Sequence, residues 1–142
     1  MEEQQNIIEN KPKRPQLLTI MCILTFIGSG MGFMGFLAVA LQYESSMEAL
    51  RVFYGDMPEA NFMLQAPRDF FVISTILMMA SVAGAILMWN LRKAGFHLYT
   101  SSQLIYLILP FIYFYGQTNP MLNIILTALF VYLYARNLQF MR

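Results

Sequence analysis

The uncharged polar residues that could do chemistry within this chain lie on two apolar stretches toward its C-terminal end. Gln103 and Tyr106 fall on one face of the first stretch if it is helical, and Asn123 and Thr127 lie one helical turn apart on the second. Because side-chain amides are costly to leave unpaired in an apolar environment, we expect the two faces to meet. They predict either hydrogen bonds between helices or a small polar cavity or permeation path.

A second candidate group consists of basic residues in one short segment. His97 lies four residues after Lys93, which directly follows Arg92. No carboxylate lies nearby in the sequence to orient His97 as a catalytic base. Positive side chains beside an apolar stretch suit the anionic headgroups of lipids. We therefore predict that Arg92, Lys93 and His97 contact lipid headgroups, and that the chain has no catalytic residue.

The residue types that are scarce disfavour redox, metal and ion-coupled chemistry. Cys22 and His97 are the only residues of their kinds, so the chain offers no internal disulfide and no cluster of cysteine and histidine ligands. The 12 methionines are scattered over all regions, which suits the filling of packing gaps better than copper binding. The apolar stretches hold no Asp, Glu, Lys, Arg or His in their interiors, where ion-coupled carriers usually need an ionisable group. We expect no metal, no cofactor and no nucleic-acid partner.

Composition and the spacing of charges indicate a membrane protein. Of the 142 residues, 58% are hydrophobic and 12% are charged, about half the charged share of a typical soluble domain. A bilayer with a hydrocarbon core of about 30 Å needs about 20 apolar residues for each helical span. The uncharged runs predict four such helices, over about residues 17–41, 70–89, 96–115 and 120–135. The predicted fold class is therefore all-α, an integral membrane protein built as a four-transmembrane-helix bundle.

The distribution of basic residues predicts how this bundle is oriented. Lysine and arginine are enriched on the cytoplasmic side of membrane proteins. Both termini are therefore expected in the cytoplasm, in a bacterial inner membrane, with residues 1–15 as a disordered tail and 16–142 as a single membrane domain. The expectation rests on seven of the nine basic residues, which lie before the first helix, between the second and third, or after the fourth: Lys11, Lys13, Arg14, Arg92, Lys93, Arg136 and Arg142.

The segment 42–69 is the one sizeable connection outside the predicted spans. Residues 45–48 fit a helix capping box, and Met47, Leu50 and Tyr54 would share one face of the helix that follows. This pattern predicts a short amphipathic helix on the outer membrane surface. Its apolar face would rest on lipid or dock a partner protein.

Small residues on the first two predicted helices indicate close packing between backbones. Gly28, Gly32 and Gly35 line up along one face of the first helix, and Ala80 and Gly84 lie four residues apart on the second. Such residues let helices approach closely in membranes, either within one bundle or at a dimer interface. We expect the two small-residue faces to pack against each other.

The turn between the second and third predicted helices reads Leu91-Arg92-Lys93-Ala94-Gly95-Phe96-His97-Leu98-Tyr99. It is similar to the basic-Gly-Phe-x-x-Tyr turns of small four-span bacterial inner-membrane proteins, whose own function is not established. The resemblance is to proteins of the predicted architecture, and it names no substrate. Gly95 is expected to serve as the flexible break between the two spans.

Three functions follow from these patterns. The one we expect is a non-catalytic accessory or scaffold protein in the lipid bilayer, bound to another membrane protein or to a second copy of itself. A passive channel or small-molecule carrier would instead use the polar faces of the third and fourth helices. A lipid-binding or lipid-modifying protein would use Arg92, Lys93 and His97.

Overall fold

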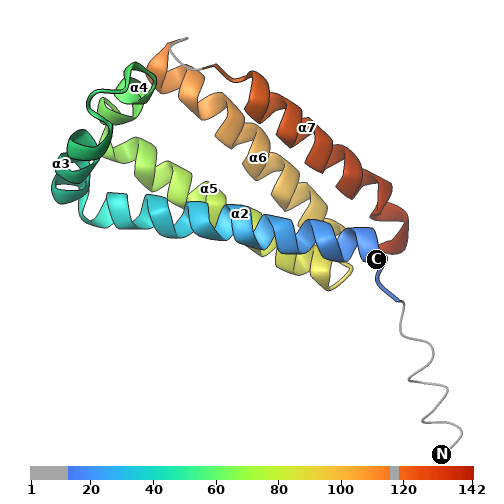
Figure 1. Ribbon diagram of the computed structural model, residues 1–142. Helices are drawn as coiled ribbons and strands as arrows, with labels where there is room; N and C mark the ends of the chain where they lie inside the picture. The colour runs from blue at the N-terminus through green and yellow to red at the C-terminus, as the bar shows by residue number, and fades with distance from the viewer. Residues whose placement is uncertain (1–12, 116–118) are drawn as a thin grey trace, which may run out of the picture.

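The computed structural model describes residues 13–115 and 119–142, and the regular secondary structure in these ranges is helical (Figure 1). The prediction of an all-α fold is therefore confirmed. The predicted tail, 1–15, lies mostly outside the described residues. The long helices are α2 (Gln16–Leu41), α5 (Arg68–Trp89), α6 (Lys93–Phe114) and α7 (Met121–Arg136).

Three segments are long and apolar enough to cross a membrane: Gln16–Leu41, Arg68–Trp89 and Met121–Phe140. The last includes both α7 and the short 3-10 turn η2 (Leu138–Phe140), so a run that looks short in the sequence reaches 20 residues. Helix α6 has 22 residues, but the polar side chains of its first half make it less apolar than the other three. Membrane association is thus supported by these three helices.

The turn between α5 and α6 is made by Leu91 and not, as expected, by Gly95. Leu91 has a φ of 58°, and the N–H of Arg92 donates to the carbonyl of Leu87 at 2.9 Å. This hydrogen bond closes the C-terminus of α5 in the manner usual for a residue in the left-handed region. Helix α6 consequently begins three residues earlier than predicted, and Gly95 lies inside it.

The connection between α2 and α5 is helical, as the pattern of residues 42–69 predicts, with α3 (Tyr43–Tyr54), η1 (Pro58–Ala60) and α4 (Asn61–Leu64). The predicted capping box is wrong, because α3 begins at Tyr43 and has no side-chain cap. Tyr43 starts the helix early since its hydroxyl donates to the carbonyl of Ala66 at 2.6 Å, and Met47 is buried below it.

The bundle has two ends, which we name by their contents. The terminal end holds the start of α2, the α5–α6 turn and η2, and the loop end holds α3, η1 and α4 (Figure 1). Helix α2 packs along α5, and α5 packs along α6. One apolar cluster fills the terminal end, formed by Leu18, Met21, Cys22, Met88, Tyr99, Tyr134 and Met141. Another fills the loop end, formed by Ala40, Met47, Ala66, Phe70, Phe71, Leu109 and Phe114.

Candidate functional site

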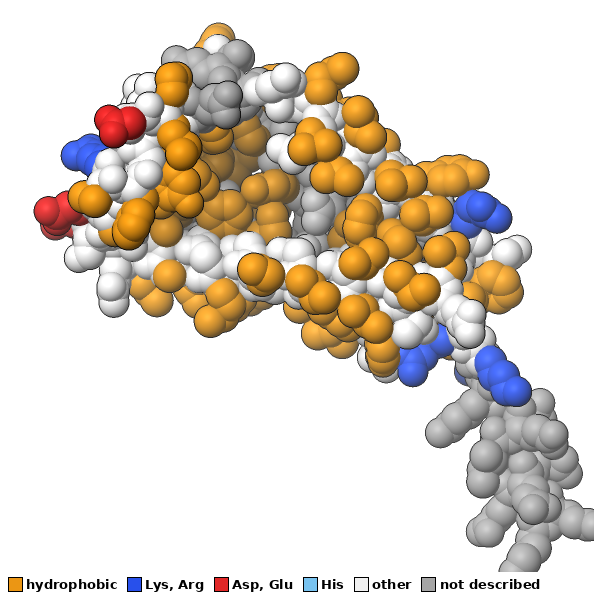
Figure 2. Space-filling view, viewed as in Figure 1, with side chains coloured by type: hydrophobic (Ala, Val, Ile, Leu, Met, Phe, Trp, Pro, Cys, Tyr) orange, Lys and Arg blue, Asp and Glu red, His pale blue; other side chains and the backbone are white. Residues whose placement is uncertain are grey.

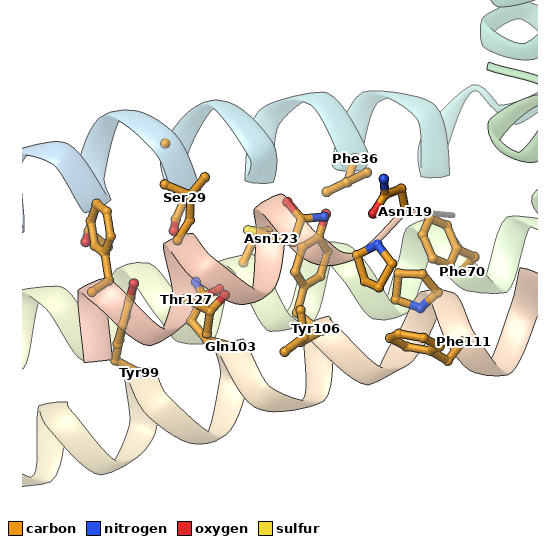
Figure 3. Close-up of a pocket in the computed structure, with 18 of the residues that line it drawn as sticks. Ser29, Phe36, Phe70, Tyr99, Gln103, Tyr106, Phe111, Asn119, Asn123 and Thr127 are labelled. Atoms are coloured by element: carbon orange, nitrogen blue, oxygen red, sulfur yellow. The ribbon is translucent and has the colours of Figure 1, made fainter. Parts of the chain in front are cut away.

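A cavity of about 760 Å³ lies between the two apolar clusters, with walls from α2, α5, α6 and α7 and with α4 at its loop end. Figure 2 shows this side of the molecule hollowed between α2 and α7, with hydrophobic side chains around the opening. The four polar residues predicted to meet, Gln103, Tyr106, Asn123 and Thr127, all line this cavity (Figure 3). The structure therefore brings the polar faces of α6 and α7 to one cavity.

Helix α7 is fixed to the bundle at the terminal end. The hydroxyls of Thr25 on α2 and Tyr134 on α7 are hydrogen-bonded at 2.7 Å, and both side chains are buried. The Tyr134 ring meets the Tyr99 ring edge to face, with centroids 4.9 Å apart. At the same end of the bundle, the N–H of Lys93 donates to the carbonyl of Arg142 at 2.8 Å. The terminal end of the cavity is thereby closed.

Toward the loop end, α7 separates from α2 (Figure 1). Met121, Leu122 and Ile125 are 64%, 67% and 59% exposed, whereas Tyr134 is fully buried. A spanning helix whose apolar side chains have no protein neighbours faces lipid tails, which are as apolar as leucine. The cavity consequently opens sideways, between α2 and the first turns of α7.

The Gln103 amide pairs with α5 and not with α7. Its Nε2 donates to the Ser81 hydroxyl at 3.0 Å, and this hydroxyl also lies 3.0 Å from that of Ser29 on α2. The faces of Gln103 and of Asn123 were expected to meet, and both residues line the cavity, but the hydrogen bond that Gln103 makes is to Ser81 on α5. One signal of this layer is present in the sequence, since Thr25 and Ser29 lie four residues apart in the apolar middle of the helix.

We expect the Ser29–Ser81 hydrogen bond to contribute about 0.6 kcal/mol, the average found for such bonds between membrane helices. A double-mutant cycle with Ser29→Ala and Ser81→Ala measures this coupling free energy in detergent-based unfolding. Zero coupling would show that the polar layer adds nothing to the packing of α2 on α5. The Gln103→Leu variant is the control, since it removes only the second bond to Ser81.

Pro110 leaves one backbone carbonyl of α6 without its helical donor. Proline has no N–H, so the carbonyl four residues earlier, that of Tyr106, loses its usual helical donor. Pro110 and Tyr106 both line the cavity, and residues four apart lie on one face of a helix. Figure 3 shows the Tyr106 side chain extending from α6 toward α2 and Phe36.

The two small-residue faces do not pack against each other as expected. A Cβ atom on Gly84 would lie 2.9 Å from the carbonyl oxygen of Gly95, so the face of α5 that carries Gly84 packs against α6. A Cβ on Gly32 would meet the sulfur of Met78 on α5 at 3.3 Å. Gly84 approaches α6 because Gly95, the one glycine of that helix, lets the two backbones come together.

Gly28 and Gly35 have no such neighbour. A Cβ on either residue would meet nothing within 4 Å, and Gly28 lies in the wall of the cavity. The missing side chain of Gly28 therefore widens the space between α2 and α7.

The basic residues form a separate group at the terminal end. Arg92, Lys93 and His97 are exposed there. The Arg14 guanidinium lies 4.1 Å from the centre of the Trp89 ring, a cation–π contact that fixes it beside the α5–α6 turn. In residues 13–115 and 119–142 no three His, Cys, Asp or Glu side chains come together as metal ligands would.

Comparisons of this chain with protein-family models, with curated proteins and with solved structures give no match. The class of protein is defined by its own geometry: a helical protein with three helices long and apolar enough to span a membrane and a cavity that is closed at one end.

Proposed function

We propose that this chain is a non-catalytic multi-pass membrane protein that binds a small amphipathic molecule in the cavity between α2, α5, α6 and α7. The observation that carries the proposal is the shape of the cavity, polar in its middle, closed at the terminal end and open sideways. A protein that sequesters or carries a lipid-like molecule needs such a route from the bilayer to a polar binding site.

The volume supports a small molecule over a protein helix as the occupant. Cavities for small ligands measure about 300–1,000 Å³, and this one measures about 760 Å³. A transmembrane helix about 10 Å across and 30 Å long displaces roughly 2,400 Å³. A partner helix would therefore have to rest outside the cavity.

The closed terminal end argues against a passive channel. A channel needs a continuous polar route, but Leu18, Met21 and Met88 pack with Tyr134 where such a route would leave the cavity. A site reached from one side suits binding or carrying better than free conduction.

We further propose that α6 crosses the membrane as a fourth span. It lies alongside α5 and has the same number of residues, 22, so its ends fall near those of a helix apolar enough to span. The basic terminal end then faces the cytoplasm and the acidic loop end, with Glu44, Glu48 and Asp56, faces outward. A bacterial inner membrane is the setting we propose.

Filling the cavity tests the proposed function. Gly28→Leu is expected to reduce binding of an amphipathic probe at least 10-fold, because the new side chain occupies the cavity without meeting protein atoms near its Cβ. Gly30→Leu is the matched control: its Cβ also meets nothing within 4 Å, and it lies on the opposite side of α2, away from the cavity. Native mass spectrometry of the purified chain counts the bound molecules. Equal binding by both variants would refute the proposal.

An accessory role is the second candidate, favoured by the outer face of α3. Val52 and Phe53 are 79% and 77% exposed, on the side of α3 away from the buried Met47. A surface helix that buries one apolar face and exposes another suits a docked partner protein. A partner in fixed stoichiometry that is lost with Phe53→Ser, yet retained with Gly28→Leu, would favour this role.

A further inference from the structure

The described residues in the wall of the cavity include no Asp, Glu, Lys, Arg or His, and this restricts the charge of its occupant. The Lys, Arg, Asp and Glu residues in the described ranges lie toward the two ends of the bundle, outside its middle. Burial of an ion away from water costs several kcal/mol unless a countercharge compensates it. No countercharge lines the cavity, so a phosphate or carboxylate there would be unpaired.

Two residues of α6 in this wall, Gln103 and Tyr106, carry oxygens that can accept hydrogen bonds. The Tyr106 carbonyl lacks its helical donor because of Pro110. The Gln103 Oε1 remains free to accept, since the Nε2 of the same amide donates to Ser81. The Thr25 hydroxyl is less available to an occupant, because it is already hydrogen-bonded to the hydroxyl of Tyr134. An occupant that brings donors would satisfy these oxygens.

Asn123 and Thr127 face the same space from α7 and provide both donors and acceptors (Figure 3). They lie opposite Gln103 and Tyr106, so a compact polar head between the helices meets both walls. The sideways opening above them is surrounded by apolar side chains (Figure 2). A hydrocarbon chain attached to the head would leave through this opening into the bilayer.

We infer that the occupant is an uncharged lipid with a hydroxyl-bearing head, of the class of acylglycerols and long-chain alcohols. The inference rests on the proposed function and adds the chemistry of the ligand. The hydroxyls donate to the Tyr106 carbonyl and to Gln103 Oε1, and accept from the Asn123 amide. The class excludes phospholipids, whose phosphate would have to enter an uncharged wall.

Three probes with the same oleoyl chain test this chemistry. Monooleoylglycerol is uncharged and has hydroxyls, lysophosphatidylglycerol has hydroxyls and a negative charge, and methyl oleate has neither hydroxyls nor charge. Competition at equal concentrations is followed by native mass spectrometry of the full chain. Only binding that Gly28→Leu removes is counted, so that lipid held by the basic terminal end is excluded.

Monooleoylglycerol is expected to bind at least 10-fold more tightly than either of the other probes. Asn123→Leu should lower its advantage over methyl oleate to below 3-fold, whereas Leu122→Ala, at an exposed neighbouring position, should preserve it. The two α7 variants are chosen because their side chains are not needed by the core, and circular dichroism verifies that both fold.

The results distinguish a failure of the inferred ligand chemistry from a failure of the proposed function. If the three probes bind equally, or if lysophosphatidylglycerol binds most tightly, and Gly28→Leu removes the binding, the inferred chemistry is overturned and the cavity remains a binding site. If Gly28→Leu removes no binding of any probe, the proposed function itself fails. Retention of the full preference by Asn123→Leu would also overturn the inference.

Discussion

Replacing Gly95 by alanine is expected to lower the free energy of unfolding by about 2–3 kcal/mol, because an added methyl group has no room between α5 and α6. A Cβ on Gly95 would lie 2.5 Å from the carbonyl oxygen of Gly84 and 2.6 Å from the backbone nitrogen of Met88. These are backbone atoms, which cannot rotate away as a side chain does. The two helices would have to separate, and unfolding in mixed micelles followed by circular dichroism measures the loss.

The control for this substitution is Gly30→Ala on α2. A Cβ there meets nothing within 4 Å, so the variant should gain up to ~1 kcal/mol from the higher helix propensity of alanine. Opposite signs for the two glycines would establish that the α5–α6 contact depends on the absence of a side chain. A neutral Gly95→Ala variant would mean that α5 and α6 do not approach as closely as described.

Removing the Tyr134 side chain is expected to release α7 from the bundle. Tyr134 is fully buried, bonds Thr25 and packs on Tyr99. Large-to-small substitutions at buried aromatic residues cost about 3–5 kcal/mol in soluble cores. Because lipid replaces water here, we expect Tyr134→Ala to cost on the order of 2 kcal/mol, mainly through lost packing. Spin-label distances between exposed positions 31 and 122 should broaden and lengthen.

Two companion variants separate the causes. Tyr132→Ala removes a tyrosine from the same helix that is 59% exposed, so neither stability nor the distance should change. Tyr134→Phe removes only the hydroxyl and should cost about 1 kcal/mol, while leaving the ring in place. An unchanged distance distribution in Tyr134→Ala would show that α7 is held by other contacts.

The pattern of charges and apolar runs predicted the helices well, because the bilayer imposes one requirement on every span. The predicted ranges 17–41 and 120–135 agree with α2 and α7 to within one residue at each end. The start of α6 was less accurate, since Leu91 adopts a left-handed conformation for which its residue type gives no signal. Helix α3 also started early, since a tertiary contact of Tyr43 outweighed the local capping signal.

The partners of individual residues were harder to predict than the helices. Periodicity tells which residues share a face, but several neighbours can satisfy the same face. The Gly84 face was therefore expected to pack on α2, although Gly84 contacts Gly95 on α6. The Gln103 face was expected to meet α7, although Gln103 donates to Ser81 on α5. The polar residues that line the cavity were predicted, but its sideways opening was not, because a side chain facing a groove and one facing lipid have the same hydropathy.

The attachment of α7 through its last turns also imposes an order on biosynthesis. Chains acquire structure from the N-terminal side as they are made, and the contacts among α2, α5 and α6 require nothing from α7. Tyr134 and the Arg142 backbone, which fix α7, leave the ribosome after most of that helix. The cavity is thus exposed to hydrocarbon before α7, its last wall, is in place. A molecule that fills it during this interval would raise the yield of correctly assembled protein as well as occupy the finished one.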